Sequence, residues 1–107
     1  MILYTGQATY YNIEGGYTAC VTLQNDNQFL VAMNAPQFDP YTSNGNPNRN
    51  SLCGKTVRIN GPKGSVTAVV IDRCPSCQYG DLDLTPAAFQ AIADLSQGRV
   101  SISWSWL

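Results

Sequence analysis

The 107-residue chain contains no histidine, and only 12% of its residues are charged. Without histidine, a Ser-His-Asp triad, a histidine general base and an HExxH zinc site are excluded. The six Lys and Arg residues do not outnumber the seven Asp and Glu residues, so no basic excess favours nucleic acid or an anionic membrane. We expect neither as a partner.

Long apolar runs are also missing. None reaches the roughly 18 residues that a membrane-spanning helix needs, and the apolar start Met1-Ile2-Leu3 is too short for the core of a signal peptide. We interpret the chain as a mature secreted domain that begins with a start methionine. No Dx[DN]xDG calcium loop occurs, and we predict no metal and no other cofactor.

Four cysteines in a short chain with few charges indicate a disulfide framework formed in an oxidising compartment. Of the three possible pairings we favour Cys20–Cys53 with Cys74–Cys77. The first bond closes a loop of about 33 residues, worth roughly 3–4 kcal/mol from chain entropy. A four-cysteine zinc site stays open, although only Cys74 and Cys77 are close in sequence. A redox CxxC also stays open, although Cys74 follows an apolar strand rather than opening a helix.

Strand patterns dominate the chain, which by its length forms one domain over residues 1–107. The expected strands are β-prone, apolar or alternating segments bounded by turn residues. The turn Asn60-Gly61-Pro62-Lys63-Gly64 joins two of them into the clearest hairpin. These strand segments are residues 8–11, 29–33, 55–59, 65–71 and 100–106.

One helix is well signalled after the acidic segment. Thr85 can be its N-cap and Pro86 its first residue, where a missing N–H costs nothing. We predict that the helix continues to Asp94, before Gly98. Residues 39–51, crowded with Pro, Asn and Gly, are predicted to form a long polar loop.

The large aromatic residues are divided between core and surface. Phe29, Phe38 and Phe89 are expected in the core. Trp104 and Trp106 share one parity on the last strand. We expect Trp104 to face the core or to lie beside the groove, and Trp106 to be partly exposed near the terminus.

The densest polar cluster runs from Asp72 to Asp83. In Asp81-Leu82-Asp83-Leu84 the period of two puts both acids on one face and both leucines in the core. A structural role is open for each acid: Asp72 could pair with Arg73 or cap a turn, Asp81 could be solvated, and Asp83 could serve the helix dipole.

Specific motifs occur in order along nearly the whole chain. They are Gly6-Gln7-Ala8-Thr9-Tyr10-Tyr11, Asp72-Arg73-Cys74-Pro75-Ser76-Cys77, Gly80-Asp81-Leu82-Asp83-Leu84-Thr85-Pro86-Ala87-Ala88-Phe89 and Gly98-Arg99-Val100. With these motifs the chain resembles the expansin/RlpA-like superfamily, and most of all its single-domain fungal members, the loosenins. The resemblance implies a mainly β fold, namely a six-stranded double-psi β-barrel with one or two short helices.

The resemblance also implies a site. Expansin-like barrels hold a shallow polysaccharide groove, with an essential acid matching Asp83, a second acid matching Asp72 and a threonine matching Thr9. Such proteins loosen cellulose or chitin networks without strong hydrolysis. The chain departs from plant expansins in having Asp81-Leu82-Asp83 in place of their His-Phe-Asp triplet, and it matches only the barrel domain of two-domain expansins. Where some bacterial expansins have a tyrosine, Cys74 stands here.

Sugar binding needs flat aromatic faces beside hydrogen-bonding groups, which tyrosine supplies with its ring and its hydroxyl. For any single tyrosine a structural role is equally open. The candidate binding residues are Tyr10, Tyr11, Tyr41, Tyr79, Asp81 and Asn12, with Tyr17, Asn44 and Asn48 beside them.

We therefore expect a secreted, monomeric, expansin-like protein whose partner is a cell-wall polysaccharide of the cellulose or chitin type, loosened without significant hydrolysis. One alternative is an inhibitor of papain-type proteases, with residues 39–51 as the inhibitory loop. Another is a glycoside hydrolase or lytic transglycosylase with Asp83 as general acid, its pKa raised by partial shielding. A barwin-like, plant-facing effector has no positive sign in the sequence.

Overall fold

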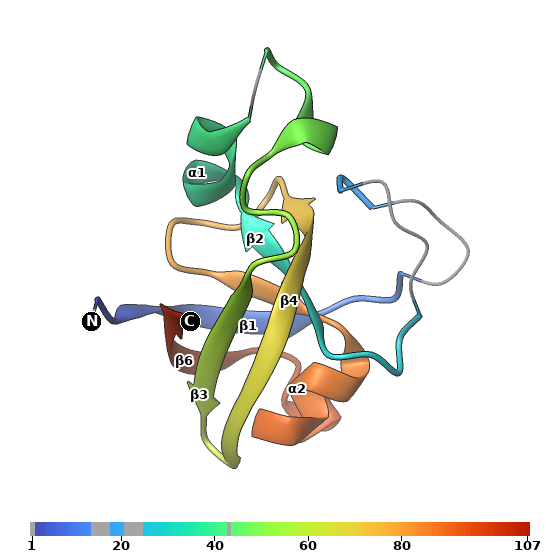
Figure 1. Ribbon diagram of the computed structural model, residues 1–107. Helices are drawn as coiled ribbons and strands as arrows, with labels where there is room; N and C mark the ends of the chain where they lie inside the picture. Colours follow the sequence, from blue (N-terminus) through green and yellow to red (C-terminus); the bar gives the residue numbers. More distant parts are fainter. Residues whose placement is uncertain (1, 14–17, 21–24, 43) are drawn as a thin grey trace.

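The computed structural model describes residues 2–13, 18–20, 25–42 and 44–107. Six strands close into a barrel in the order β1-β5-β2-β4-β3-β6, and Figure 1 shows both chain ends on the same side of it. The predicted fold class is confirmed. The strands are β1 (Tyr4–Tyr10), β2 (Leu30–Asn34), β3 (Thr56–Gly61), β4 (Gly64–Cys74), β5 (Leu82–Leu84) and β6 (Val100–Trp106).

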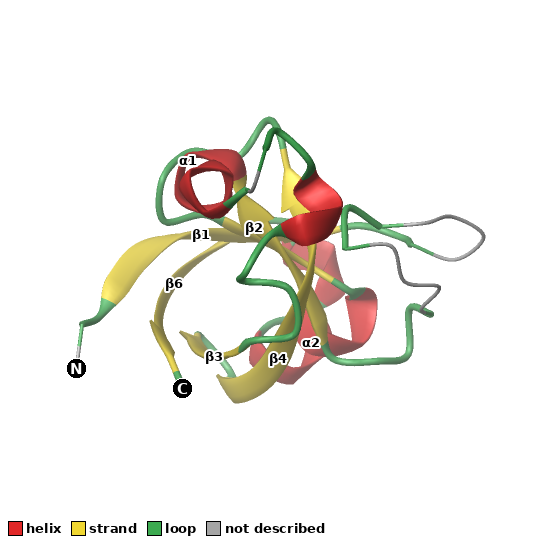
Figure 2. Ribbon diagram, turned by 45° about the horizontal axis from the view of Figure 1, so that its top comes forward, coloured by secondary structure: helices red, strands yellow, loops and turns green. Residues whose placement is uncertain are grey.

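Short helices follow β2 and β5. Helix α1 (Ala35–Phe38) lies directly after β2 (Figure 2). Helix α2 (Pro86–Ile92) follows β5 in the chain. Three 3₁₀ turns cover Asp39–Tyr41, Pro47–Arg49 and Leu95–Gln97, so the predicted 39–51 loop contains two of them. No helix within the described ranges is long and apolar enough to cross a membrane.

The core fills the barrel with inward side chains from every strand. Trp104, Phe38 and Phe89 are fully buried, as expected from their size. Phe29 is a correction, because half of its surface is exposed. It precedes the first residue of β2, and only its backbone carbonyl joins the sheet, accepting from the Val69 N–H.

Helix α2 begins at Pro86 as predicted but ends at Ile92, short of Asp94. Thr85 is the N-cap residue as predicted, and its carbonyl accepts from the Phe89 N–H at 3.0 Å. Its hydroxyl makes no cap bond, but donates to the Gln28 carbonyl at 2.5 Å and accepts from the Leu30 N–H at 3.2 Å. Thr85 therefore also ties the start of α2 to the chain entering β2.

The turn before β5 crosses β1 at very close range. A Cβ placed on Gly6 would lie 2.3 Å from the Gly80 carbonyl oxygen, so both positions require glycine. The buried Trp104 indole donates to the same oxygen at 2.9 Å. This crossing fixes where β5 starts.

Both favoured cysteine pairs form disulfide bonds, Cys20–Cys53 and Cys74–Cys77. All four cysteines are therefore in disulfide bonds. No thiolate is left to bind zinc, which rules out the four-cysteine zinc site. The predicted hairpin is also present, with Gly61 paired to Gly64 across the turn.

Candidate functional site

Four residues lie in one row across neighbouring strands. Thr9 of β1 pairs with Asp83 of β5, Asp83 with Ala32 of β2, and Ala32 with Asp72 of β4. Residues paired in register share a face of the sheet. Because the leucines flanking Asp83 are fully buried, this shared face is the outer one. We call Thr9, Asp83, Ala32 and Asp72 the acidic row.

Asp72 reaches the outer face through an irregularity in β4. Ala68 and Val70 point into the core, so strict alternation would send Asp72 inward as well. The β2–β4 register shifts between Val31 and Ala32, leaving Ile71 as an extra residue on β4. Such bulges re-aim side chains beside functional sites, and this one places Asp72 in the row with Asp83.

The Asp83 carboxyl is more than half buried and has few partners. The Thr9 hydroxyl donates to its Oδ1 at 2.8 Å. Burial raises the pKa of Asp83 above its ordinary value, and the neighbouring Asp72 raises it further, whereas the Thr9 hydrogen bond and the charge of Arg99 oppose the rise. Burial therefore favours the protonated form of Asp83.

Asp72 differs because its two oxygens accept three hydrogen bonds. Tyr11 donates through its hydroxyl at 3.0 Å, and the backbone N–H groups of Ala19 and Arg73 donate at 2.8 and 2.9 Å. Burial and the adjacent carboxylate strongly raise the pKa of Tyr11, which stays a donor. The Asp72 carboxyl is therefore held in a fixed position, and most of its hydrogen-bond acceptor sites are already used.

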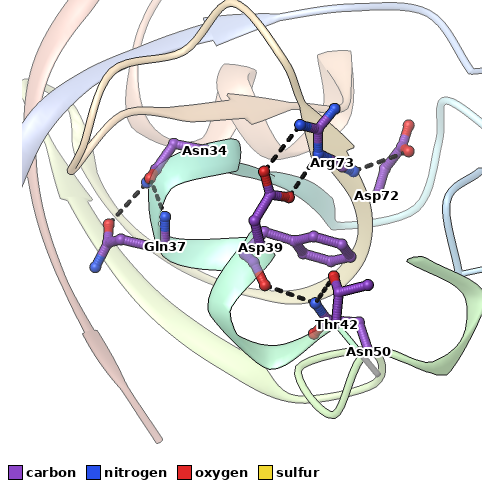
Figure 3. Close-up of polar contacts among 8 residues, drawn as sticks. Asn34, Gln37, Asp39, Thr42, Asn50, Asp72 and Arg73 are labelled. Atoms are coloured by element: carbon purple, nitrogen blue, oxygen red, sulfur yellow. Dashed lines mark hydrogen bonds and ion pairs between the residues drawn. The ribbon is translucent and has the colours of Figure 1, made fainter. Parts of the chain in front are cut away.

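The Arg73 side chain does not pair with Asp72. Its guanidinium forms two bonds to Asp39, at 2.7 and 2.9 Å, while only its backbone reaches Asp72 (Figure 3). The alternative that Asp72 pairs with the Arg73 side chain is therefore wrong, because the guanidinium extends from the end of β4 to the 3₁₀ turn after α1. The ion pair borders a cleft of about 380 Å³ that Thr42 and Pro47 also line.

A buried amide pair holds the segment before β5. The Asn34 side chain donates to Gln37 Oε1 at 2.7 Å and to the Asp81 carbonyl at 2.9 Å. The same Gln37 oxygen accepts from the Gly80 N–H at 3.1 Å. Figure 3 shows the Asn34–Gln37 contact. These bonds set the path of the chain into Asp83, and the sequence analysis did not single out either residue.

The other predicted binding residues do not all lie at the acidic row. Tyr11 belongs to the row through Asp72, and Asn12 is exposed next to it. Tyr10 packs on Phe89 and donates to a backbone carbonyl, which ties it to α2. The Asp81 carboxyl accepts from two backbone N–H groups, of Gln7 and Gln78.

Tyr41 and Tyr79 lie elsewhere. They line a hollow with Tyr4 and Trp106, at the start of β1 and the end of β6. Thr9 of the acidic row lies five residues after Tyr4 on β1, a separation of about 17 Å along the strand. Asn44 and Asn48 are exposed in the polar loop, and Tyr17 lies outside the described residues.

Arg99 is a site neighbour that sequence reasoning missed. Its guanidinium donates to Gln7 Oε1 at 3.0 Å, and its charge acts on Asp83. The Gly98-Arg99-Val100 motif was the sequence feature that could have pointed to Arg99. Over the described residues, no three His, Cys, Asp or Glu side chains gather in a way that could hold a metal ion.

Comparison with known proteins identifies the family. A double-psi β-barrel family described as lytic transglycolase matches residues 4–104. The chain belongs to this family. Papain inhibitor from Streptomyces mobaraensis is 37% identical over 106 residues, covering 96% of this chain and 71% of that protein. Expansin-YoaJ from Bacillus subtilis is 31% identical over 102 residues, covering 95% of this chain and 42% of that protein.

Solved structures of a papain inhibitor and of an expansin both superpose on the whole barrel. A Streptomyces papain inhibitor has a TM-score of 0.87 and 36% identity, covering 99% of this chain and 94% of that one. An expansin mutant from Clavibacter michiganensis in complex with cellohexaose has a TM-score of 0.83 and 27% identity, covering 99% and 50%. The expected membership of the expansin/RlpA-like superfamily is confirmed, and the barrel spans about half the length of the expansins it matches.

Proposed function

We propose that this expansin-like barrel is secreted, binds a cell-wall polysaccharide of the cellulose or chitin type across its acidic row, and loosens that polymer without significant hydrolysis. The proposal rests on the presence of two different carboxyl groups in one outer row. Asp83 has a raised pKa, whereas the oxygens of Asp72 already accept hydrogen bonds. The cellohexaose complex of a related expansin supports a glucan as the ligand, and the disulfides fit an extracellular setting.

The two carboxyl groups have different capacities. A protonated Asp83 donates a hydrogen bond to a sugar or glycosidic oxygen and so competes with the bonds that hold neighbouring glycan chains together. Hydrolysis requires in addition a carboxylate free to activate water. Asp72 already accepts from Tyr11, Ala19 and Arg73, so the second step is disfavoured and the glycan is disturbed rather than cut.

The test replaces the proton donor alone. Asp83→Asn keeps an oxygen that accepts from Thr9 but replaces the acidic O–H with an amide N–H, which is a weaker donor and cannot transfer a proton. We expect fibre weakening of cellulose paper to fall by about tenfold or more. Asp94→Asn, in an exposed ion pair with Lys63, is the matched control and should retain wild-type weakening. Full activity of Asp83→Asn would refute the role of this acid.

Soluble products separate loosening from cleavage. The same incubations are assayed for reducing sugar and for soluble fragments of labelled cellulose, chitin and peptidoglycan. Loosening predicts fibre weakening without release. Release that disappears in Asp83→Asn would instead establish a hydrolase or lytic transglycosylase with Asp83 as its general acid.

Inhibition of papain-type proteases is a second candidate. It is favoured by the 37% identity to a papain inhibitor across 96% of this chain. The exposed loop around residues 44–48, held at its base by the Asp39–Arg73 pair, is the segment we would assign to it. Papain activity is measured with wild-type protein, with Asp83→Asn and with residues 44–48 replaced by Gly and Ser. Inhibition lost only in the loop variant would support this function.

A further inference from the structure

A group of aromatic side chains lies away from the acidic row. Tyr4 stacks on the buried Trp104, with ring centroids 4.6 Å apart, and Tyr79 leans on Tyr4 at 6.3 Å. Trp106 meets Trp104 edge to face at 5.5 Å. Tyr41 joins Tyr4, Tyr79 and Trp106 around one hollow. We call Tyr4, Tyr41, Tyr79 and Trp106 the aromatic shelf.

The shelf is exposed and elongated. The Tyr41 and Tyr79 side chains are among the most exposed large hydrophobic groups, at 54% and 63%. Two hollows, of about 190 and 290 Å³, share Tyr41 and Trp106. Because the hollows adjoin through these two rings, the surface suits an extended ligand better than a compact one.

The chemistry of the lining points to an uncharged ligand. Pro36, Gln37 and Pro40 complete the first hollow, and none of its described lining residues is charged. Tyrosine rings contact apolar C–H faces while their hydroxyls remain hydrated, and a pyranose presents C–H faces edged with hydroxyls. Of the residues that the structure describes around the two hollows, only Lys55 in the second has a charged side chain.

The shelf is also held in place before any ligand arrives. Tyr41 closes a 3₁₀ turn that begins with Asp39, which Arg73 binds. Tyr79 precedes Gly80, whose N–H is bonded to Gln37. These bonds fix the backbone beside Tyr41 and Tyr79, and the Tyr79 and Trp106 rings also contact Tyr4 and Trp104. A backbone positioned in advance loses little freedom on binding, so more of the contact energy appears as affinity.

We propose that the aromatic shelf is a second binding site that takes a chain of neutral pyranose sugars, such as a β-1,4-glucan, by stacking on Tyr41, Tyr79 and Trp106. The choice of a glycan rests on the proposed function, but the site does not use Asp83. The shelf adds a second contact to the polymer that the acidic row binds and acts on, so loss of the shelf can be measured separately from loss of the acid.

Tryptophan fluorescence reports on the shelf directly. Of the two tryptophans in the chain, Trp104 is fully buried and Trp106 is partly exposed. Titration of the full chain with cellohexaose should give a saturable change from Trp106. In Tyr41→Ala/Tyr79→Ala we expect about tenfold weaker binding or more, both to cellohexaose and to insoluble cellulose.

Matched variants keep the test decisive. Phe29→Ala removes an aromatic that is exposed elsewhere and should bind like the wild type. Asp94→Asn, in its exposed ion pair with Lys63, should also bind cellohexaose like the wild type. The fluorescence titration does not depend on fibre weakening, so it still tests the shelf if the proposed loosening activity is absent. Circular dichroism checks that each variant is folded.

Three outcomes would overturn the proposal. The first is no saturable fluorescence change in the wild type, and the second is wild-type binding by the folded double variant. The third is a double variant that loses papain inhibition while keeping its affinity for cellohexaose, which would assign the shelf to a protein partner.

Discussion

Two carboxyl groups in one row differ because their partners differ. Asp83 is half-buried and has one side-chain donor, whereas Asp72 has three donors. Period two predicted that Asp83 faces outward between two buried leucines, whereas Asp72 became a candidate through the polar cluster it begins and through the family resemblance. The sequence could not predict their difference, because the donors come from Tyr11 and Ala19, which are distant in sequence.

The pH dependence of stability should reveal Asp83. Its pKa in the folded state lies above its ordinary value of 3.8, so between those two values the folded state binds more protons than the unfolded state. The free energy of unfolding then falls as pH rises through that window. Denaturant unfolding between pH 3 and 7 should show a smaller fall in Asp83→Asn than in the wild type. An identical pH dependence in both proteins would contradict the raised pKa.

Arg99 should tune the same group. Its positive charge lowers the pKa of Asp83, so Arg99→Gln should raise that pKa and extend fibre weakening to higher pH. The measurement is the pH profile of fibre weakening for wild type and variant. Arg49→Gln, on the exposed 3₁₀ turn of the polar loop, is the matched control and should leave the profile unchanged. A downward displacement of the Arg99→Gln profile would exclude this role.

Tyr11 acts on Asp72 as a positioning residue. Tyr11→Phe keeps the ring that packs beside Ile13, Leu30 and Ile71 but removes the hydrogen bond to Asp72. We expect a loss of about 1 kcal/mol in unfolding free energy and a severalfold loss of fibre weakening. Urea unfolding and the weakening assay are run together, and unchanged weakening would show that Asp72 needs no such support.

At the scale of elements, the strands were readable where burial and alternation agree. The last strand and the β3–β4 hairpin follow from period two and from turn chemistry. The bulge at Ile71 was not readable, because nothing in an apolar run marks which residue is extra. Helix α1 was hidden for a related reason: its four residues stand before a proline-rich segment whose turn signals dominate.

The crossing of β1 by the turn before β5 allows a sharp element-scale prediction. Gly6→Ala would press a methyl group against the Gly80 backbone, and we expect a loss of about 3 kcal/mol in unfolding free energy. Gly45→Ala is the control, since its Cβ would meet nothing within 4 Å and only the positive φ carries a cost, of about 1 kcal/mol. Urea unfolding of both variants measures the difference, and equal losses would contradict the close contact.

At the scale of the whole molecule, the Cys20–Cys53 bond links the site to the scaffold. Cys20 follows Ala19, which donates to Asp72, and Cys53 precedes β3. The composition was enough to predict a disulfide framework, but not that one bond would support a site residue. That link appears only once the barrel brings residues 19 and 72 together.

Removing each disulfide should therefore have unequal effects. Cys20→Ser/Cys53→Ser opens a loop with a sequence separation of 33, and we expect a loss of about 3–4 kcal/mol in unfolding free energy together with weaker fibre loosening. Cys74→Ser/Cys77→Ser opens a much shorter loop and should cost about 2 kcal/mol. Calorimetry and the weakening assay test both, and the reverse ranking would contradict this account.

Each of the six strands that the structure describes has a hydrogen-bonded neighbour on both sides, so none of these strands presents a free edge to another protein molecule. Copies crowded together at high local concentration should then have little tendency to join through intermolecular sheets. Under the proposed function, copies bound to a fibre should remain dispersed and exchangeable along it.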